Sequence, residues 1–438
     1  MEEKKNYQKG IIVGLAGGIL GTFICAVICI VIGINLYVIQ RNSAQQEQTT
    51  PAETTTSMTD AIKEALEKEN DDKLLNKEFE DKVEEMYELL DENFLYEIDE
   101  DALRDGMYQG MMSALGDPYS TYYNEEDLTS FEESTTGKYY GIGVQVSQNM
   151  TTGVITMVKP FKGAPGYEAG ILPNDILVKV NGEEVTGVDL TEVVGMIKGE
   201  EGTTVELTLM REGEPDYIVL DVERRQVETP TVEIEMLENN IGYMLITGFE
   251  EVTAKQFLNG IGELSTQGME GLVIDLRNNP GGRLDVVVNM LDMILPEGIL
   301  VYTEDKNGNR DNEMYSNKQY VLDVPLAVLV NGESASASEI FAGDIQDFKA
   351  GIVVGTQTYG KGIVQSVYML EDGETAVKMT VSSYFTHAGR NIHEVGITPD
   401  IVVELNEELR QKVEITKEED NQLQTAIEAL MEQIKTQE

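Results

Sequence analysis

The sequence predicts an α/β core on a largely parallel sheet, with an inserted β-rich domain, helical segments at both ends and one transmembrane helix. Three observations predict this fold class. An uncharged apolar run occupies residues 11–34, apolar and polar residues alternate from about residue 130, and strand and helix patterns alternate from Pro230 onward. Alternating strands and helices are typical of parallel sheets covered by helices. A chain of 438 residues is long enough for two or three domains.

The apolar run 11–34 contains no charged and no amide residue. As a helix it would span roughly 36 Å, enough for a hydrocarbon core of about 30 Å. Lys4, Lys5 and Lys9 precede the run, so the positive-inside rule places the N-terminus in the cytoplasm and the remaining chain outside. A cleaved signal peptide is the alternative, but its apolar region would be about 7–15 residues long and a small-residue cleavage site would follow it. We therefore expect a retained, single-pass anchor in the cell membrane, with the rest of the chain extracellular.

The remaining segments follow from composition and periodicity. A polar, Thr-rich stretch with almost nothing to bury is typical of a linker, and apolar residues at spacings of three and four predict helices. Together these patterns predict the following order: a cytoplasmic N-terminus 1–10, the anchor 11–39, a linker 41–60, a helical segment 61–127, the β-rich domain 128–222, the α/β domain 223–405 and a charged C-terminal helical segment 406–438.

The charge of the chain excludes one class of partner. The 32 basic and 79 acidic residues leave a formal net charge of −47. Nucleic acid is therefore not an expected partner, because phosphate binding needs a basic surface. We interpret the acidity as solubility outside the cell. Both cysteines, Cys25 and Cys29, lie in the apolar run, so the rest of the chain has no disulfide and no thiolate metal site.

The stretch NGESASASEI, residues 331–340, joins a predicted buried strand to a predicted helix. Its serines are Ser334, Ser336 and Ser338. For Ser336 two interpretations are open. With Glu339 it fits a capping box, in which the two side chains satisfy free amides at a helix start. It also fits a nucleophile, because a serine at a tight strand-to-helix turn is exposed beside amides that can stabilise negative charge.

A serine nucleophile needs a base. The chain has two histidines, His387 and His393, and nothing in the sequence ties either one to a carboxylate or to a serine. Lys361 is the other candidate, and it precedes an apolar strand on which Gln365 could orient its amine without adding a charge. A lysine base must have its pKa of about 10.4 lowered by roughly three units, which requires apolar surroundings. The alternative is an ordinary surface lysine.

Several blocks of this sequence resemble the carboxy-terminal processing peptidases, a serine–lysine family. DLRNNPGG, NGESASASEI, GTQTYGKGIVQ and GITPDI look like the signature blocks of that family and stand in its order. LGDPYSTYY and YYGIGVQV resemble its leading segments, and AGILPNDILVKVNG resembles its PDZ module. The resemblance covers roughly residues 75–405. The departures are His387, where Pro is expected, and Glu333, where a small residue is common; neither of them touches the dyad.

The resemblance implies a role for each matching residue. It implies that Ser336 is the nucleophile, Lys361 the general base and Gln365 the residue that orients the base. The oxyanion donors would be the amides of Ala337 and of a glycine in DLRNNPGG, Gly282 rather than Gly281. The α/β domain would then be a serine endopeptidase that cleaves protein substrates near their C-termini by acyl transfer, without a metal or another cofactor.

The β-rich domain would be a PDZ domain that captures the substrate C-terminus. Tyr140, Gly141, Ile142 and Gly143 look like its carboxylate-binding loop. Lys198, near the end of the helix that forms the other wall of the groove, would contact the substrate terminus or the peptidase domain. A solvated lysine at a helix end is the alternative for Lys198.

The expected partners are proteins or peptides with exposed apolar C-termini, the membrane and a second subunit paired through the terminal helices. Two other functions stay open. The chain could be a catalytically silent PDZ scaffold or ligand-binding protein on a peptidase fold. It could also be an enzyme that is inactive until the PDZ domain binds a ligand.

Overall fold

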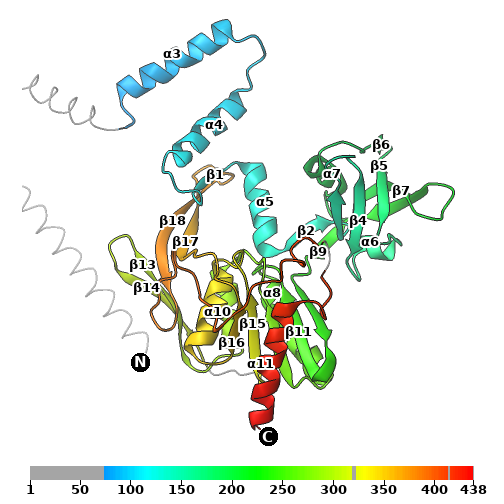
Figure 1. Ribbon diagram of the computed structural model, residues 1–438. Helices are drawn as coiled ribbons and strands as arrows, with labels where there is room; N and C mark the ends of the chain where they lie inside the picture. The colour runs from blue at the N-terminus through cyan, green and yellow to red at the C-terminus, as the bar shows by residue number, and fades with distance from the viewer. Residues whose placement is uncertain (1–73, 318–321, 413–414, 438) are drawn as a thin grey trace, which may run out of the picture. The chain divides into compact units, whose positions relative to one another are not determined.

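The computed structural model describes residues 74–317, 322–412 and 415–437 (Figure 1). The predicted cytoplasmic segment 1–10, the predicted anchor 11–39 and the linker 41–60 lie outside these residues. Among the described residues, none of the helices combines the length and the apolar character that a membrane span requires. The chain divides into two units, residues 1–98 and 99–438.

In the first unit the structure describes the helix α3 (Lys77–Asn93). Its N-cap is Asn76, whose side chain accepts a hydrogen bond from the Phe79 amide at 2.9 Å. No residue of α3 is buried, although Leu89, Leu90 and other large apolar side chains lie along it. Among the described residues of its unit, this helix therefore has an apolar face that no neighbour covers.

The second unit begins with α4 (Glu100–Ser113), β1 (Thr121–Tyr123) and α5 (Glu125–Thr136). The helix α5 ends at Gly137, which adopts a left-handed conformation that favours glycine. The chain then enters the β-rich domain through β2 (Lys138–Gly141) and leaves it through β9 (Arg225–Glu228). These two strands pair antiparallel with each other, so both crossings lie side by side.

The β-rich domain is an antiparallel sheet with two short helices, α6 (Pro165–Glu168) and α7 (Leu190–Ile197). Its main strands lie in the order β3 (Val144–Gln148), β4 (Ile155–Pro160), β5 (Asp175–Val180), β7 (Thr204–Met210), β8 (Ile218–Glu223), and β6 (Glu183–Glu184) pairs with β5. Alternate residues of these strands, such as Leu207 and Leu209, are fully buried and form a core of their own with Val193 of α7.

The α/β domain is built on a six-stranded sheet. Its strands lie in the order β10 (Val232–Met236), β11 (Ile241–Ile246), β12 (Gly271–Asp275), β15 (Leu326–Val330), β16 (Ile352–Gly355), β19 (Ile401–Val402). The strand β10 is antiparallel to β11, and the other pairs are parallel. The predicted, largely parallel sheet is therefore present.

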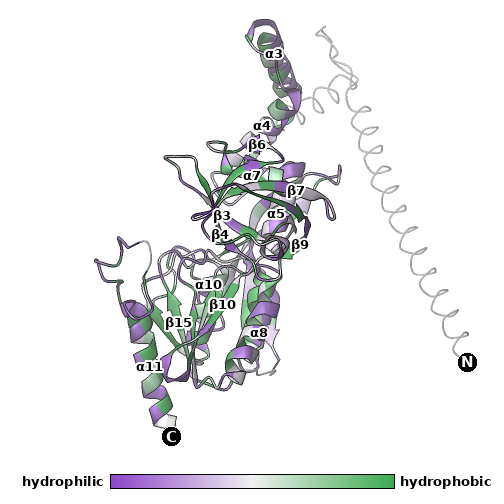
Figure 2. Cartoon of the chain, turned by 90° about the vertical axis from the view of Figure 1, so that its right-hand side faces the viewer, coloured by the Kyte–Doolittle hydropathy of each residue, from purple (hydrophilic) through white to green (hydrophobic). Residues whose placement is uncertain are grey.

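Helices cover both faces of this sheet (Figure 1). The helices α8 (Thr253–Thr266), α9 (Leu284–Asp292) and α10 (Ala337–Asp347) share one apolar core with alternate strand residues. The C-terminal helix α11 (Asn421–Gln437) packs on the opposite face of the sheet, where the other alternate strand residues form a second core. Burial on both faces explains why β15 is apolar throughout and why β12 is apolar up to Asp275. Figure 2 shows the hydrophobic colour of β15.

A second, antiparallel sheet was not predicted from the sequence. It contains β1, β13 (Gly298–Asp305), β14 (Arg310–Ser316) and β18 (Ala376–Phe385), and β17 (Ile363–Met369) pairs with β18. The strand after Lys361 begins at Ile363, and a bulge between Val364 and Gln365 interrupts its alternation. The strand β17, which follows Lys361, belongs to this sheet, and the sheet lies beside the N-terminus of α10, where Ser336 is located.

Candidate active site

Ser336 occupies the turn between β15 and α10, where it is the N-cap of the helix. Its backbone has φ 55° and ψ −115°, a combination that residues with a side chain rarely adopt. Such strained positions cluster at functional sites, because the surrounding structure must hold them in place. The side chain is half-buried and lines a cavity of about 370 Å³.

The two neighbouring serines have structural roles. Ser334 is fully buried and donates a hydrogen bond to the carbonyl of Leu276 at 2.8 Å. Ser338 is also fully buried and donates to the carbonyl of Asn279 at 2.9 Å. Both hydroxyls thereby tie the start of α10 to the loop after β12. Of the three serines, Ser336 is the one that lines the cavity.

The capping interaction expected from the sequence is present, and it does more than cap the helix. The fully buried Glu339 carboxylate accepts a hydrogen bond from the Ser336 amide at 2.8 Å. It also accepts from the amides of Gly360 at 2.7 Å and Lys361 at 2.9 Å, and from Thr358 Oγ1 at 2.6 Å. One carboxylate therefore joins the backbone of Ser336 to the backbone of Lys361. The capping box and the candidate active site are parts of one arrangement.

The loop after β12 brings two glycines against the Ser336 turn. A Cβ on Gly281 would lie 2.6 Å from the Ala335 carbonyl oxygen and 2.9 Å from the Ala337 amide nitrogen. The Gly281 amide donates to Asn279 Oδ1 at 2.8 Å and is therefore already used. Among the described residues, no acceptor pairs with the amides of Gly282 and Ala337, and both residues line the cavity. These two amides are free to bind an oxyanion.

Lys361 lines the same cavity as Ser336. Its Nζ lies 4.2 Å from the centre of the Tyr119 ring. Burial lowers the pKa of Lys361 below its usual value, and the positive charge of Lys378 lowers it further, against the opposing effect of nearby Asp117. Within the described part of the chain, no hydrogen bond joins Lys361 Nζ to Ser336 Oγ. The Lys361 side chain therefore lies in the same cavity as Ser336 and is partly desolvated, while its amine faces the Tyr119 ring.

Gln365 also lines the cavity, and its amide has a defined orientation. Its Nε2 donates to Thr380 Oγ1 at 3.1 Å. The Thr380 hydroxyl in turn hydrogen-bonds to the carboxylate of Asp117. An ionised carboxylate can only accept, so Thr380 donates to Asp117 and accepts from Gln365. This leaves Gln365 Oε1 as the free end of the amide.

Asp117 belongs to a segment whose role the sequence analysis did not find. It accepts hydrogen bonds from Ser120 Oγ at 2.5 Å and from the Tyr119 amide at 3.1 Å. Burial raises the pKa of Asp117, but the hydrogen bonds from Ser120 and Thr380 hold it below its usual value. Two signals in the sequence mark this segment: Gly-Asp-Pro breaks the helical pattern in GDPYSTYY, residues 116–123, and the same stretch belongs to one of the blocks that carry the family resemblance.

The histidines do not take part in the cavity. His387 Nδ1 hydrogen-bonds to the carbonyl of Ile299 at 2.8 Å, and its ring centre lies 3.9 Å from that of Phe348. Neither His387 nor His393 is among the residues that line the Ser336 cavity. Among the described residues, no group of three His, Cys, Asp or Glu side chains could hold a metal ion.

The residues proposed for peptide binding lie in and beside β2, apart from the Ser336 cavity. Tyr140 is exposed, and Gly141 ends β2. The side chain of Ile142 is buried in the core of the β-rich domain, so only its backbone could contact a ligand. Gly143 has φ 69°, and a Cβ there would lie 2.3 Å from Ala164 Cβ, so only glycine fits. Among the described residues, no acceptor pairs with the amides of Ile142 and Gly143.

Lys198 follows α7 as its C-cap. Its Nζ pairs with the Glu133 carboxylate of α5 at 2.5 Å and lies 5.2 Å from the centre of the Tyr139 ring. The side chain therefore contacts the helix before the β-rich domain.

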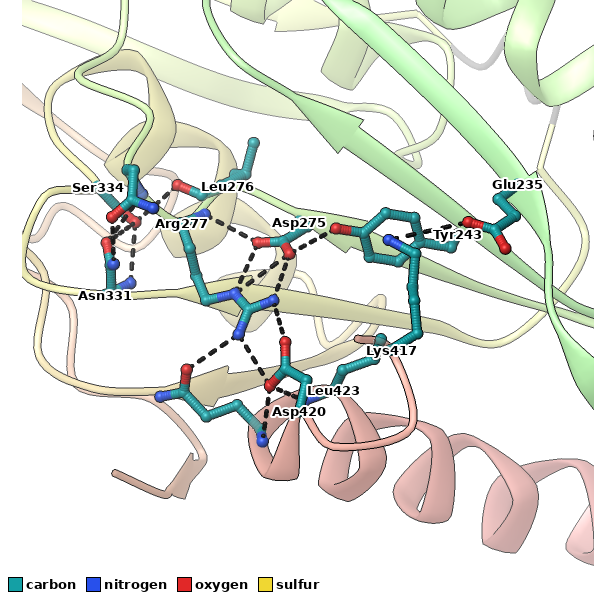
Figure 3. Close-up of polar contacts among 12 residues, drawn as sticks. Glu235, Tyr243, Asp275, Leu276, Arg277, Asn331, Ser334, Lys417, Asp420 and Leu423 are labelled. Atoms are coloured by element: carbon teal, nitrogen blue, oxygen red, sulfur yellow. Dashed lines mark hydrogen bonds and ion pairs between the residues drawn. The ribbon is translucent and has the colours of Figure 1, made fainter. Parts of the chain in front are cut away.

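A buried ionic cluster anchors α11 to the end of β12 (Figure 3). Arg277 donates to Asp275 Oδ2 at 2.6 Å and to Asp420 Oδ2 at 2.7 Å. Tyr243 donates to the same Asp275 oxygen at 2.8 Å, and Gln422 Oε1 accepts from Arg277 at 3.0 Å. Arg277 immediately precedes the loop that carries Gly281 and Gly282. Sequence reasoning had no signal for this cluster, because Arg277 and Asp420 are 143 positions apart.

Comparisons with protein families agree with this domain order. Residues 240–403 match the model of peptidase family S41, and residues 160–211 match that of the PDZ domain. Residues 30–127 match the model of the activating protease CtpB N-terminal domain.

Individual relatives match most of the chain. The carboxy-terminal processing protease CtpA of Bacillus subtilis (strain 168) is 39% identical over 326 residues, which are 74% of this chain and 69% of that protein. The carboxy-terminal processing protease CtpB of the same organism is 35% identical over 327 residues, 74% of this chain and 67% of that protein. A solved structure of a photosystem II D1 C-terminal processing protease is 31% identical with a TM-score of 0.42, and the match covers 68% of this chain and 80% of that one.

Proposed function

Because this chain belongs to peptidase family S41 and is a serine-type carboxy-terminal processing protease, we propose that Ser336 and Lys361 form its catalytic dyad. One observation carries the proposal. A serine with a strained backbone, a lysine with a lowered pKa and two free amides line one cavity. That combination supplies a nucleophile, a base and an oxyanion site.

In the proposed reaction, neutral Lys361 takes the proton of Ser336 Oγ as that oxygen attacks a substrate carbonyl carbon. The Gln365 oxygen accepts a hydrogen bond from the lysine amine and keeps it directed at the serine. The amides of Ala337 and Gly282 bind the oxyanion, and each such donor is typically worth about 3–4 kcal/mol in the transition state. Lys361 then protonates the leaving amine, and water hydrolyses the acyl-enzyme by the same route.

The dyad hydrogen bond forms in the substrate complex. Catalytic hydrogen bonds are often long in the free enzyme and tighten when substrate binds. In this chain, Lys361 Nζ rests 4.2 Å from the centre of the Tyr119 ring. An aromatic face holds a protonated amine by a cation–π interaction. A neutral amine forms only a weak hydrogen bond to an aromatic face and a stronger one to an amide oxygen. When Lys361 loses its proton, its side chain is therefore favoured to move away from Tyr119 and toward Gln365 and Ser336.

The PDZ domain binds the C-terminus of the substrate. Its carboxylate would be bound by the backbone amides of the segment Tyr140 to Gly143, and the free amides of Ile142 and Gly143 support this role. The substrates are proteins or peptides with exposed apolar C-termini. Cleavage near a terminus follows if the same substrate strand continues from the PDZ domain to Ser336.

The chain is a single-pass membrane protein with its N-terminus in the cytoplasm and its catalytic domain outside. The apolar run 11–34 and the preceding lysines support this topology. The N-terminal helix α3 pairs two subunits, whereas the apolar face of α11 packs on the sheet of its own chain. Support comes from α3, which has no buried residue but has exposed apolar side chains such as Leu89 and Leu90.

The experiment that tests the dyad incubates the full-length chain with an unfolded protein that ends in apolar residues. Ser336→Ala and Lys361→Ala are assayed beside the parent. We expect cleavage by the parent and by neither variant. Cleavage that survives in Ser336→Ala would overturn the nucleophile. If the parent does not cleave, a PDZ-binding peptide is added in trans. Activity that then appears supports an enzyme controlled by the PDZ domain, and continued inactivity overturns the proposal in favour of a silent scaffold.

A further inference from the structure

Lys378 is a second lysine in the cavity of Ser336. It lies on β18, where it faces Val367 of β17, while Gln365 faces Thr380. Lys378 is therefore one side-chain pair further along the sheet than Gln365, a step of about 7 Å. The mechanism proposed above does not use it.

Within the described part of the chain, the surroundings of Lys378 differ from those of the lysines that pair with a carboxylate. Among the described residues, no carboxylate forms an ion pair with it. Its ammonium lies instead near two aromatic rings, 5.2 Å from the centre of Tyr123 and 5.4 Å from that of Phe131. Aromatic rings hold a cation in place without neutralising it. Lys159 and Lys198, by contrast, each pair with a glutamate.

The other charged residues of the cavity do not compensate Lys378. The lining includes one carboxylate, Asp285, and this carboxylate pairs with Arg283 at 2.9 Å. Lys378 has no such partner in the lining, whereas Lys361 is influenced by the nearby carboxylates of Asp117 and Glu339. A partly buried cavity with uncompensated positive charge concentrates its field on a bound anion, because water screens the interaction less there than at the surface.

We propose that Lys378 binds a carboxylate of the substrate strand close to the scissile bond, so that an acidic group there increases cleavage. This inference rests on the proposed function of the Ser336 cavity. An extended peptide advances about 3.3 Å per residue, so the step from Gln365 to Lys378 corresponds to about two or three residues from the scissile carbonyl. The carboxylate belongs either to an Asp or Glu side chain or to the substrate's own C-terminus, since both offer the same two oxygens.

The test is a peptide series cleaved by the full-length chain. One glutamate is moved through three positions on each side of the scissile bond, and each peptide has a glutamine counterpart. We expect one position at which kcat/KM for Glu exceeds that for Gln about fivefold, the size expected of one partly buried charge pair. In Lys378→Gln the ratio falls to about one, and in Lys378→Glu it inverts. Lys378→Arg keeps the preference.

The source of the carboxylate is decided by a second set of peptides. Each peptide is made with a C-terminal carboxylate and with a C-terminal amide. A preference that follows the terminus and disappears in Lys378→Gln assigns the site to the substrate C-terminus. A preference that follows the glutamate assigns it to a side chain. The matched control is Lys306→Gln, a change at an exposed lysine outside the cavity lining, which keeps the wild-type ratios.

Two outcomes overturn the inference: equal cleavage of all Glu and Gln pairs by the parent, or an unchanged preference in Lys378→Gln. Binding of the same peptides to Ser336→Ala, measured by fluorescence anisotropy, gives a readout without turnover. One outcome would contradict the proposed function but support the carboxylate site. In it, the glutamate peptide binds more tightly than the glutamine peptide, the difference depends on Lys378, and the parent cleaves neither peptide. Equal cleavage of both peptides by the parent, with equal Kd values, would support the proposed function and contradict the carboxylate site.

Discussion

Gln365 and Thr380 face each other across β17 and β18, and Gln365 Nε2 donates to Thr380 Oγ1 at 3.1 Å. Asp117 holds the Thr380 hydroxyl from the other side. This chain of donors and acceptors decides which end of the Gln365 amide is free. An amide turned the other way would offer N–H groups to Lys361 and could not accept from its amine.

The first prediction concerns this orientation. Thr380→Val removes the hydroxyl at nearly constant shape, so the Gln365 amide loses its acceptor and is free to turn. We expect kcat to fall about tenfold, the equivalent of one hydrogen bond of about 1.4 kcal/mol, with little change in KM. Thr380→Ser, which keeps the hydroxyl, restores most of the rate. Equal rates in the Val and Ser variants, measured across the pH range, would show that the hydroxyl does not position Gln365.

The second prediction is the pH dependence of Lys361. Burial, and after it the charge of Lys378, lowers its pKa in the folded chain below the usual value of 10.5. In the proposed mechanism the active form is the neutral amine, so kcat/KM rises with pH and the midpoint of the rise lies below pH 10.5. Removing the charge in Lys378→Gln moves this rise to higher pH. A pH profile identical in the two proteins would contradict the electrostatic part of the argument.

The same group affects stability with a definite sign. The folded chain binds the Lys361 proton less tightly than the unfolded chain, so protonation opposes folding. The stability that depends on this group therefore rises as pH increases through the folded pKa toward 10.5. At neutral pH, Lys361→Met removes the buried cation, and we expect an inactive protein with a higher Tm. A lower Tm than in the exposed control Lys306→Met would contradict this expectation.

The third prediction concerns Glu339, the carboxylate between the two halves of the site. Glu339→Gln removes the charge and replaces one acceptor oxygen with a donor, which faces the amides of Ser336 and Lys361. A hydrogen bond to a charged group contributes about 1.5–3 kcal/mol, so both activity and stability fall markedly. Glu333→Gln, in the same turn but exposed, is the matched control and leaves both within error. Urea denaturation and peptide cleavage measure the difference.

The fourth prediction concerns the backbone contact behind the oxyanion site. Gly281 has φ 102°, and a Cβ there would lie 2.9 Å from the Ala337 nitrogen. Gly281→Ala therefore displaces the Ala337 amide, and we expect a loss of about 100-fold in kcat, the effect of losing one oxyanion donor. Gly262→Ala, in α8 with no atom within 4 Å of the added Cβ, retains full activity. Full activity in Gly281→Ala would exclude Ala337 as a donor.

The fifth prediction concerns the ionic cluster that anchors α11. Arg277→Met leaves the buried carboxylates of Asp275 and Asp420 without their counter-ion. Breaking a buried pair in this way costs about 3–5 kcal/mol of unfolding free energy. Hydrogen exchange in α11 should rise with the loss, because Arg277 is its ionic link to β12. Arg104→Met, which breaks the exposed pair with Asp101, should cost less than about 1 kcal/mol.

The sequence by itself determined the class of the fold and identified the candidate catalytic residues. Strands that are buried on both faces are largely apolar, so β15 and the residues of β12 before Asp275 were visible as apolar runs. Ser336, Lys361 and Gln365 stand in blocks whose residues lie close together along the chain. Local patterns of this kind are set by backbone geometry over a few residues, which is why a single sequence reveals them.

Only the tertiary structure decided what surrounds those residues. The network of Asp117, Thr380 and Gln365, the contact of Lys361 with Tyr119 and the pair of Arg277 with Asp420 each join segments far apart in the chain. The second sheet and the bulge at Gln365 are equally non-local. A pKa, a free amide and an uncompensated charge such as Lys378 depend on burial and on neighbours from other elements, and no pattern along the chain records these.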